Sequence, residues 1–223
     1  MNDKQRVALH AANLIEDGMV VGLGTGSTAN YFIDELASRH ADGLTITTVA
    51  SSIVSANRAQ QMGLTVIAME QLSNIDVYVD GADEVSPNMA LLKGRGSDLV
   101  REKLLANASD QFLVLIDSSK CVDRIGQNFP IPIEVAPFSW KMVLHSVVDM
   151  GGKGALRPNG DGLAVTSHGS LVLDMAFDAA LTSQQLNEQL NAVPGIVEHG
   201  IFEQLATAIL IGENDQVTIL KTG

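Results

Sequence analysis

The first half of the chain alternates short apolar runs with longer segments of helical periodicity. Runs such as MVVGL at 19–23 and IDVYV at 75–79 are too short for helices and rich in Val, so they predict buried strands. Between such runs, apolar residues recur every three or four positions, as on one face of a helix. Strands that alternate with helices favour an α/β fold with a mostly parallel sheet covered on both faces.

The same patterns give the expected bounds of the elements in this half. Helices are predicted at 3–17, 27–40, 52–63 and 97–109. Strands are predicted at 19–23, 44–50, 64–68, 75–79 and 111–116. Gly18 and Gly63 end two of the helices, and Ser97 is expected to cap the last one at its N-terminus.

The pattern changes at three prolines, Pro130, Pro132 and Pro137, which mark a junction. Beyond them the sequence predicts a helix, a hairpin that turns at His168–Gly169, a second helix and a strand. Their ranges are 138–149, 162–175, 182–191 and 195–202. Two further strands are predicted at 207–212 and 217–221, and the first of them can rejoin the large sheet.

These two patterns predict two structural parts. An α/β domain is expected to comprise 1–127 and 204–223, and a small α+β subdomain to comprise 128–203. Phe138 and Trp140 are expected to pack in the core of the smaller part.

Composition and charge narrow the function. The chain is 46% apolar and 18% charged, which is typical of a globular protein. Its formal net charge of −12 argues against a nucleic-acid partner, since such proteins usually present a basic face. An anionic small molecule remains compatible with this charge, because a local cationic pocket can bind it.

The expected location is the cytoplasm. Cys121 is the only cysteine, so no internal disulfide can form, which suits a reducing compartment. Residues 1–18 are charged and lack the apolar core of a signal peptide. No apolar run approaches the roughly 20 residues of a membrane span, so no membrane association is expected.

The segment GLGTGSTAN follows the first predicted strand and is the first candidate site. Gly22, Gly24 and Gly26 permit tight turns, and Ser27 and Thr28 open a helix whose N-terminal amides favour an anion. A phosphate cradle is therefore expected, with a glycine-rich turn that binds nothing as the alternative. The segment lacks the Lys of a Walker loop, and the next strand lacks the acid of a dinucleotide site.

The segment VDGADEV crowds carboxylates at the end of another strand. Gly81 and Ala82 are small, so the loop can bring Asp80 and Asp83 close together. Such a pair can bind a metal, exchange protons or form an ordinary polar turn. The chain offers no His or Asp cluster at ligand spacing, so no metal is expected.

Two later segments add basic and acidic candidates. In LLKGRGSDLVREK, Lys93 precedes the turn 94–96, and Glu102 lies about one turn inside the following helix. An ordinary charged helix face is the alternative for Glu102. In DSSK, Lys120 can meet a phosphate as a point charge or belong to a polar loop.

These motifs together resemble the ribose-5-phosphate isomerase A family. GLGTGSTA, YVDGADEV, LLKGRGSDLVREK and DSSK occur in that family's order and spacing, and LNAVPGIVEHGIF resembles its C-terminal region. The resemblance implies a Rossmann-like domain with a small α+β (ferredoxin-like) lid, assembled as a homodimer or a dimer of dimers. It implies interconversion of D-ribose 5-phosphate and D-ribulose 5-phosphate in the pentose phosphate pathway, without metal or organic cofactor.

The resemblance also implies residue roles. It makes Glu102 the proton-transfer base and puts Asp80, Asp83 and Lys93 at the sugar. The residues expected to bind substrate are Thr25, Gly26, Ser27, Thr28, Asp80, Gly81, Ala82, Asp83, Lys93, Gly94, Arg95, Gly96 and Lys120. Arg95 either strengthens phosphate binding or obstructs the pocket. Glu84 is expected to be structural or to support residues that contact the substrate.

The residue types suit an aldose–ketose isomerisation. One carboxylate beside a cis-enediolate can take a proton from C2 and return it to C1. The enediolate oxygen needs a preplaced donor, for which Lys93 is the candidate. Opening the sugar ring needs an acid and a base, and Asp80 and Asp83 could share one proton for this step, with either as the acid.

Four other functions remain open at this point. A sugar-phosphate sensor needs no base, but such proteins usually carry a basic DNA-binding segment, which the sequence lacks. A CoA-transferase-like enzyme would use a glutamate nucleophile. A metal-dependent isomerase would lose activity in EDTA. An isomerase with a shifted sugar-phosphate preference would keep the base and change the contacts to the sugar.

Overall fold

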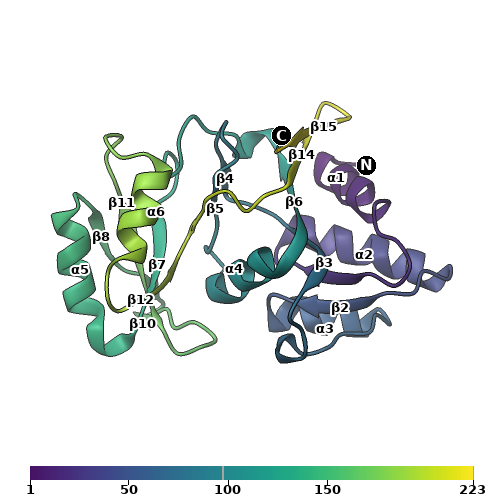
Figure 1. Cartoon of the computed structure of the whole chain (residues 1–223), viewed down its shortest axis with the longest axis horizontal. Helices are drawn as coiled ribbons and strands as arrows, with labels where there is room; N and C mark the ends of the chain where they lie inside the picture. Colours follow the sequence, from purple (N-terminus) through teal and green to yellow (C-terminus); the bar gives the residue numbers. More distant parts are fainter. Residues whose placement is uncertain (97, 223) are drawn as a thin grey trace. The chain divides into compact units, whose positions relative to one another are not determined.

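The computed structural model describes residues 1–96 and 98–222 of the chain. It divides into two compact units (Figure 1). The first unit comprises Met1–Ala82, Arg101–Lys120 and Leu205–Gly223. The second comprises Asp83–Val100 and Cys121–Gln204. From the sequence, 83–100 and 121–127 are instead expected in the larger part. Contacts between residues far apart in sequence join them to the second unit, since Leu91–Leu92 pairs with Ile201–Phe202 and the Gly126 amide donates to Glu84.

The first unit is built on one six-stranded sheet with the order β15-β14-β6-β3-β1-β2. Its strands are β1 (Val20–Leu23), β2 (Thr47–Ala50), β3 (Ile75–Asp80), β6 (Ser109–Asp117), β14 (Ala208–Glu213) and β15 (Gln216–Lys221). All neighbouring pairs are parallel except β14 with β15. The mostly parallel sheet is confirmed, and the expected return of 207–212 to it is confirmed as β14.

The strand order contains a reversal that matters for ligand binding. From β1 the chain crosses to β2 on one side, whereas from β3 it crosses to β6 on the other. Right-handed crossovers in opposite directions put the helices that precede β2 and β6 on opposite faces. In open α/β sheets, ligands bind at the carboxyl ends of the strands where this reversal occurs, which here are β1 and β3.

The helices largely follow their predicted ranges. They are α1 (Asp3–Ala12), α2 (Ser27–Ala41), α3 (Ile53–Gln61) and α4 (Leu99–Ala108), with short 3-10 turns at η1 (Met69–Gln71) and η2 (Ser118–Lys120). The first helix ends five residues early, since Ile15 reaches the core from the turn that follows it. The predicted cap of α4 at Ser97 lies outside the described residues.

One predicted strand of this unit is wrong. The segment 64–68 forms only an isolated bridge between Thr48 and Val66. Two backbone hydrogen bonds, from Thr48 to Thr65 and from Ile67 to Thr48, join it to the edge of the sheet. Its apolar side chains therefore cover the sheet edge rather than extend the ladder.

The second unit contains a four-stranded antiparallel sheet with the order β12-β7-β11-β8. Its elements are β7 (Ile131–Val135), α5 (Trp140–Asp149), β8 (Lys153–Leu156), β11 (Leu171–Ala176), α6 (Ser183–Asn191) and β12 (Ile196–His199), with a 3-10 turn at η3 (Pro137–Ser139). This βαββαβ order is the ferredoxin-like arrangement. The predicted hairpin turn is confirmed, since Val165 and Leu171 bridge across it.

Short strands complete this unit. They are β4 (Glu84–Val85), β5 (Leu91–Leu92) and β13 (Ile201–Phe202) in one sheet, and β9 (Pro158–Asn159) with β10 (Gly162–Leu163) in another. The predicted strand 195–202 is thus two strands in different sheets. They part at Gly200, where a Cβ atom would lie 2.4 Å from the carbonyl oxygen of Lys93.

The central strand β7 was not predicted. Its segment contains Pro132, and proline is usually excluded from a central strand because it cannot donate to the ladder. The carbonyl oxygen of Pro132 nevertheless accepts a 2.8 Å hydrogen bond from the amide of Gly200. The prolines therefore mark a strand as well as a junction.

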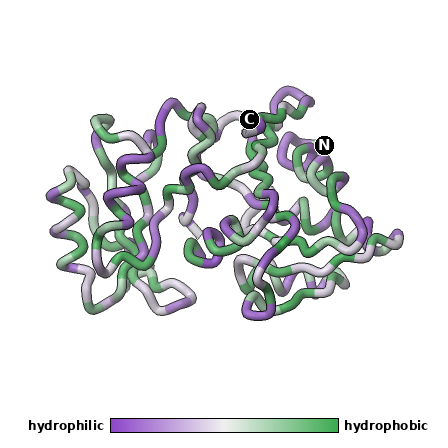
Figure 2. Tube along the Cα trace, viewed as in Figure 1, coloured by the Kyte–Doolittle hydropathy of each residue, from purple (hydrophilic) through white to green (hydrophobic). Residues whose placement is uncertain are grey.

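Each unit has its own hydrophobic core. One cluster draws on the sheet and helices of the first unit, and the other on β7, β11, α5 and α6. Figure 2 shows that apolar residues recur through both units. Phe138, expected in the second core, is instead 88% exposed. Among the described residues, no helix combines the length and apolar character that crossing a membrane requires.

Candidate functional site

The ends of β1 and β3 approach each other closely at Gly24 and Asp80. A Cβ atom on Gly24 would lie 2.1 Å from Oδ1 of Asp80, so only glycine fits there. Oδ1 accepts hydrogen bonds from the amides of Thr25 (3.0 Å) and Gly81 (2.7 Å). The buried Asp80 carboxylate therefore joins the glycine-rich loop to the loop after β3.

Tyr78 supports the other side of this carboxylate. Its hydroxyl donates to Oδ2 of Asp80, and its ring stacks on Phe112 with centroids 4.9 Å apart. Burial raises the pKa of Tyr78 well above its usual value, and the negative charges of Asp80 and Glu102 add to the effect. Tyr78 therefore stays a proton donor. From the sequence, Tyr78 is expected only to belong to the strand IDVYV, and its contact with Asp80 is not predicted.

Glu102 lies in the first turn of α4, as predicted, and its side chain is buried. Its charge acts on Tyr78, so it lies near the same strand end as Asp80. The neighbouring Arg101 donates a 3.0 Å hydrogen bond to the carbonyl of Ala50 at the end of β2. The start of α4 is thereby fixed against the strand ends of the first unit.

The predicted phosphate cradle forms the N-terminus of α2. Gly26 adopts a φ of +115°, a conformation that favours glycine, and no side chain caps the helix. Its first amides therefore face outward as a potential anion site. Nζ of Lys4 donates to the Ser27 hydroxyl at 3.2 Å and lies 4.0 Å from Oδ2 of Asp117, the first residue of the DSSK segment. Sequence reasoning missed Lys4, which no motif distinguishes from other surface lysines.

A cluster of hydroxyl groups surrounds Thr25. Its Oγ1 lies 2.9 Å from Oγ of Ser51, 2.7 Å from Oγ of Ser52 and 3.1 Å from Oγ of Ser55. Ser55 in turn donates to the carbonyl of Gly24 at 2.6 Å. The sequence SSIVS after a strand is the signal from which this cluster could be predicted.

In the second unit, Asp83 directly precedes β4 and Lys93 directly follows β5, two strands of the small three-stranded sheet. The Asp83 amide donates to the Leu92 carbonyl at 2.8 Å, and the Lys93 amide to that of Gly200 at 2.9 Å. The Lys93 side chain is buried, with Nζ 5.7 Å from the centre of the Phe202 ring. Lys93 is therefore not a solvated surface residue.

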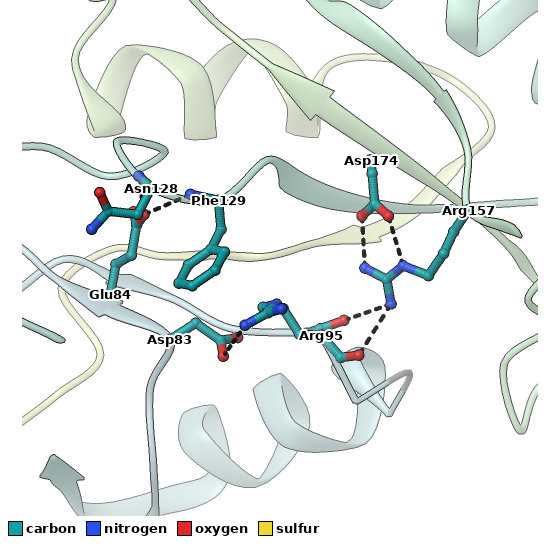
Figure 3. A network of polar contacts seen from close by, with 8 residues as sticks. Asp83, Glu84, Arg95, Asn128, Phe129, Arg157 and Asp174 are labelled. Carbon is teal, nitrogen blue, oxygen red and sulfur yellow. Dashed lines mark hydrogen bonds and ion pairs between the residues drawn. The ribbon is translucent and has the colours of Figure 1, made fainter. Parts of the chain in front are cut away.

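Arg95 is held by two neighbours (Figure 3). Its guanidinium lies 4.0 Å from the centre of the Phe129 ring, and its Nη1 lies 3.9 Å from Oδ1 of Asp83. About half of the side chain remains exposed, at 51%. In this position Arg95 carries positive charge beside a predicted sugar-site carboxylate. Gly94 before it adopts a φ of +97°, and Gly96 after it is exposed.

Glu84 holds the loop that carries Phe129. Its buried carboxylate accepts hydrogen bonds from the amides of Gly126 and Asn128, both at 2.6 Å, and of Phe129 at 3.0 Å. Figure 3 shows this carboxylate beside the Asn128–Phe129 backbone. The expected structural role of Glu84 is confirmed.

The predicted site residues are thus divided between the units. The first unit carries Thr25, Gly26, Ser27, Thr28, Asp80, Gly81, Ala82, Glu102 and Lys120, and the second carries Asp83, Lys93, Gly94, Arg95 and Gly96. The expected closeness of Asp80 and Asp83 stays a prediction. Over 1–96 and 98–222, no group of three or more His, Cys, Asp or Glu residues is arranged to hold a metal ion.

Comparison with known proteins points to one family over most of the chain. A sequence profile described as ribose 5-phosphate isomerase A (phosphoriboisomerase A) matches residues 47–216. A second profile, described as a DeoR C terminal sensor domain, matches residues 1–69. A protein of Thermomicrobium roseum named ribose-5-phosphate isomerase A is 40% identical over 220 residues, covering 98% of this chain and 93% of the relative.

Solved structures agree with the sequence comparison. The ribose 5-phosphate isomerase A of Methanocaldococcus jannaschii has a TM-score of 0.93 and 34% identity, covering 99% of this chain and 98% of that one. A D-ribose-5-phosphate isomerase in complex with phospho-erythronic acid has a TM-score of 0.94 and 37% identity, and the match covers 100% of both chains.

Proposed function

The chain belongs to the ribose-5-phosphate isomerase A family, and we propose how its residues interconvert D-ribose 5-phosphate and D-ribulose 5-phosphate. Similarity to an isomerase of this name over 98% of the chain makes it an aldose–ketose isomerase of pentose phosphate metabolism. The observation that supports the assignment of residues best is the buried group of Asp80, Tyr78 and Glu102 at the strand reversal of the first unit.

Glu102 is the base of the isomerisation. Its carboxylate takes the proton from C2, and the electron pair of the broken C–H bond forms the double bond of a cis-enediolate. The hydroxyl proton then passes from O2 to O1, and Glu102 returns its proton to C1 as C2 becomes the carbonyl carbon. General base catalysis of this kind contributes about 10²–10⁴-fold.

Lys93 stabilises the enediolate. Its buried ammonium supplies positive charge where the negative oxygen develops, and a preplaced donor of this kind is worth roughly 3–4 kcal/mol. Asp80 and Asp83 open the sugar ring, one as acid to the ring oxygen and one as base to the anomeric hydroxyl. The amides of Thr25 and Gly81 and the hydroxyl of Tyr78 fix the orientation of Asp80 for this step.

The phosphate binds at the N-terminus of α2. The uncapped amides after Gly26, the hydroxyls of Ser27 and Thr28, and the ammonium groups of Lys4 and Lys120 form its site. For Arg95, the contacts to Phe129 and Asp83 favour a further role as a charge near the sugar over one as an obstruction. Arg95→Gly is then expected to raise KM, whereas a lowered KM would mean that Arg95 obstructs the site.

The test is turnover by the purified protein. Conversion of ribose 5-phosphate to ribulose 5-phosphate is followed with and without EDTA, and the same rate is expected in both. Loss of activity in EDTA would mean a metal-dependent reaction. Faster turnover of another pentose phosphate would mean a shifted preference, and transfer of CoA from a thioester without isomerisation would mean CoA-transferase chemistry.

A sugar-phosphate sensor is the second candidate, and the match of residues 1–69 to a sensor-domain profile favours it. That match covers about the first third of the chain, whereas the isomerase relatives cover nearly all of it. A sensor would bind ribose 5-phosphate without turning it over. Tight binding with no detectable product would therefore replace the catalytic proposal.

A homodimer, or a dimer of dimers, in the cytoplasm completes the proposal. Phe138 and Met142 are 88% and 66% exposed near the start of α5, and such apolar side chains favour self-association. The single Cys121 suits a reducing compartment. Light scattering of the purified protein would measure the mass, and a monomer at micromolar concentration would contradict the dimer.

A further inference from the structure

The segment from Lys93 to Gly96 joins β5 to the start of α4 without strand or helix geometry. Backbone groups in such a segment need partners outside a regular ladder. Lys93 and Gly94 are buried, whereas Arg95 and Gly96 are exposed. The partners of its backbone carbonyls therefore decide how firmly the Lys93 side chain is held.

Arg157 supplies partners for two of these carbonyls. Its Nη1 donates to the carbonyl oxygens of Gly94 at 3.2 Å and Arg95 at 3.3 Å. Arg157 lies between β8 and β9, more than 60 residues further along the chain, and only 15% of its side chain is exposed. Figure 3 shows the guanidinium reaching the backbone at Arg95.

Asp174 orients this guanidinium. Its carboxylate accepts hydrogen bonds from Nε at 2.8 Å and Nη2 at 2.7 Å, so the pair is bidentate. Asp174 lies on β11, which pairs with β7 on one side and β8 on the other. A planar guanidinium can meet a carboxylate on one edge and carbonyl oxygens on another, whereas an ammonium cannot reproduce this fork.

The other side of the segment rests on Gly200. The Lys93 amide donates to the Gly200 carbonyl. Because Gly200 has no side chain, the Lys93 carbonyl can come close to it. Gly200 thus fixes the backbone at Lys93, and Arg157 fixes the two residues that follow.

We propose that Arg157, oriented by Asp174, is a positioning residue that holds the Gly94–Arg95 backbone so that the Lys93 ammonium stays at the enediolate. The inference rests on the role proposed for Lys93. A misplacement of about 1 Å can cost about 100-fold in rate. Arg157→Ala is therefore expected to lower kcat by about 10–100-fold and to change KM less than threefold, because the phosphate contacts of α2 are untouched.

The experiment compares Arg157→Ala, Arg157→Lys and Asp174→Asn with Arg58→Ala. Arg58 forms a bidentate pair with Asp34 in the first unit, with distances of 2.9 and 2.7 Å, and is a matched control for the loss of such a pair. For each variant, kcat, KM and Tm are measured with ribose 5-phosphate. Guanidinium ion is then added to Arg157→Ala.

The expected pattern is specific to positioning. All three variants of the Arg157–Asp174 pair lose kcat, so the lysine of Arg157→Lys does not replace the arginine. Guanidinium ion restores part of the kcat of Arg157→Ala. Arg58→Ala keeps kcat within about twofold. A kcat of Arg157→Ala no lower than that of Arg58→Ala, while Lys93→Met is inactive, would overturn the inference. Should Arg157→Ala not fold, a normal kcat of Asp174→Asn and Arg157→Lys would overturn it equally.

Lys93→Met and the wild type, assayed beside these variants, separate this inference from the proposed function. Full activity of Lys93→Met would remove the role of Lys93 and with it the reason for positioning it. Inactive wild-type protein would refute the isomerase itself.

Discussion

The two units hold their candidate site residues by different means. In the first, Asp80 ends a central strand and Glu102 lies in the first turn of a helix, so regular backbone hydrogen bonds position both. In the second, Lys93 and Arg95 lie in an irregular segment beside two-residue strands. Side chains distant in sequence hold that segment and its surroundings, among them Arg157 and Glu84.

This difference predicts different sensitivities to substitution. A residue positioned by many ladder bonds should tolerate the loss of one side-chain contact. A loop positioned by two or three side chains should not, because each contact is a large share of what holds it.

Lys93→Met should have the largest effect. It removes the ammonium proposed to stabilise the enediolate while keeping a similar apolar stem, so kcat should fall by about 100–1,000-fold, or roughly 3–4 kcal/mol. Steady-state kinetics measure the fall. Lys141→Met is the control, since Lys141 also lies over an aromatic ring, 5.4 Å from that of Trp140. Equal kcat values for the two variants would remove Lys93 from the chemistry.

Glu134→Gln should change how stability depends on pH. Burial raises the pKa of Glu134 from 4.5 to about 7, and the charges of Asp98 and Glu198 add to this while Thr166 and the Val100 backbone oppose it. Between these pH values the unfolded chain loses the proton and the folded chain keeps it. The free energy of unfolding therefore falls as pH rises from about 4.5 to 7 and stays lower above that.

The neutral Gln side chain removes this loss. The free energy of unfolding of Glu134→Gln minus that of the wild type should be larger at pH 8 than at pH 4, by up to about 3 kcal/mol. Each pKa unit is worth about 1.4 kcal/mol. Urea unfolding at both pH values measures the difference. Glu188→Gln is the control, because Glu188 is an exposed residue of α6. A constant offset between Glu134→Gln and wild type across this range would refute the linkage.

Glu84→Gln should destabilise the second unit by about 2 kcal/mol. The amide retains one acceptor oxygen and turns its NH₂ group toward a backbone N–H, which leaves a partly buried donor unsatisfied. Urea unfolding at pH 7 measures the loss. A change below about 0.5 kcal/mol would show that this loop does not depend on its buried carboxylate, and the contrast between the units would weaken.

Tyr78→Phe should have the smallest effect. Asp80 keeps two amide donors and its place on β3, so kcat should fall only about tenfold or less, about the worth of one hydrogen bond. Tyr31→Phe is the control, because Tyr31 is the other tyrosine of the chain and accepts only a 3.4 Å contact from Asn2. A fall above 100-fold for Tyr78→Phe would contradict the proposed tolerance of the first unit.

The same contrast explains what the sequence could predict. Local periodicity identified β1, β3, β6 and α2, and the ends of these elements carry most of the first unit's candidate residues. The place of Asp80 at a strand end followed from the predicted strand 75–79, and the place of Glu102 about one turn inside a helix followed from the predicted helix 97–109. Lys4 and Ser55 were missed because they join the loops through tertiary contacts that no local pattern encodes.

In the second unit, residue identity was predicted and its support was not. Lys93 and Arg95 stood out beside glycines, but Arg157, which follows β8, and Asp174, on β11, come together only through the pairing of these two strands. Pro132 hid the central strand β7, because the rule against proline in strands concerns its missing N–H and says nothing of its carbonyl.

The proposed mechanism depends above all on Glu102, and turnover of Glu102→Gln measures that dependence. The variant keeps the shape of the buried side chain and removes its ability to carry a proton between C2 and C1. We predict that kcat for ribose 5-phosphate falls at least about 100-fold with Tm nearly unchanged, while Glu213→Gln at the exposed end of β14 keeps full activity. A Glu102→Gln variant with the turnover of the wild type would contradict the account.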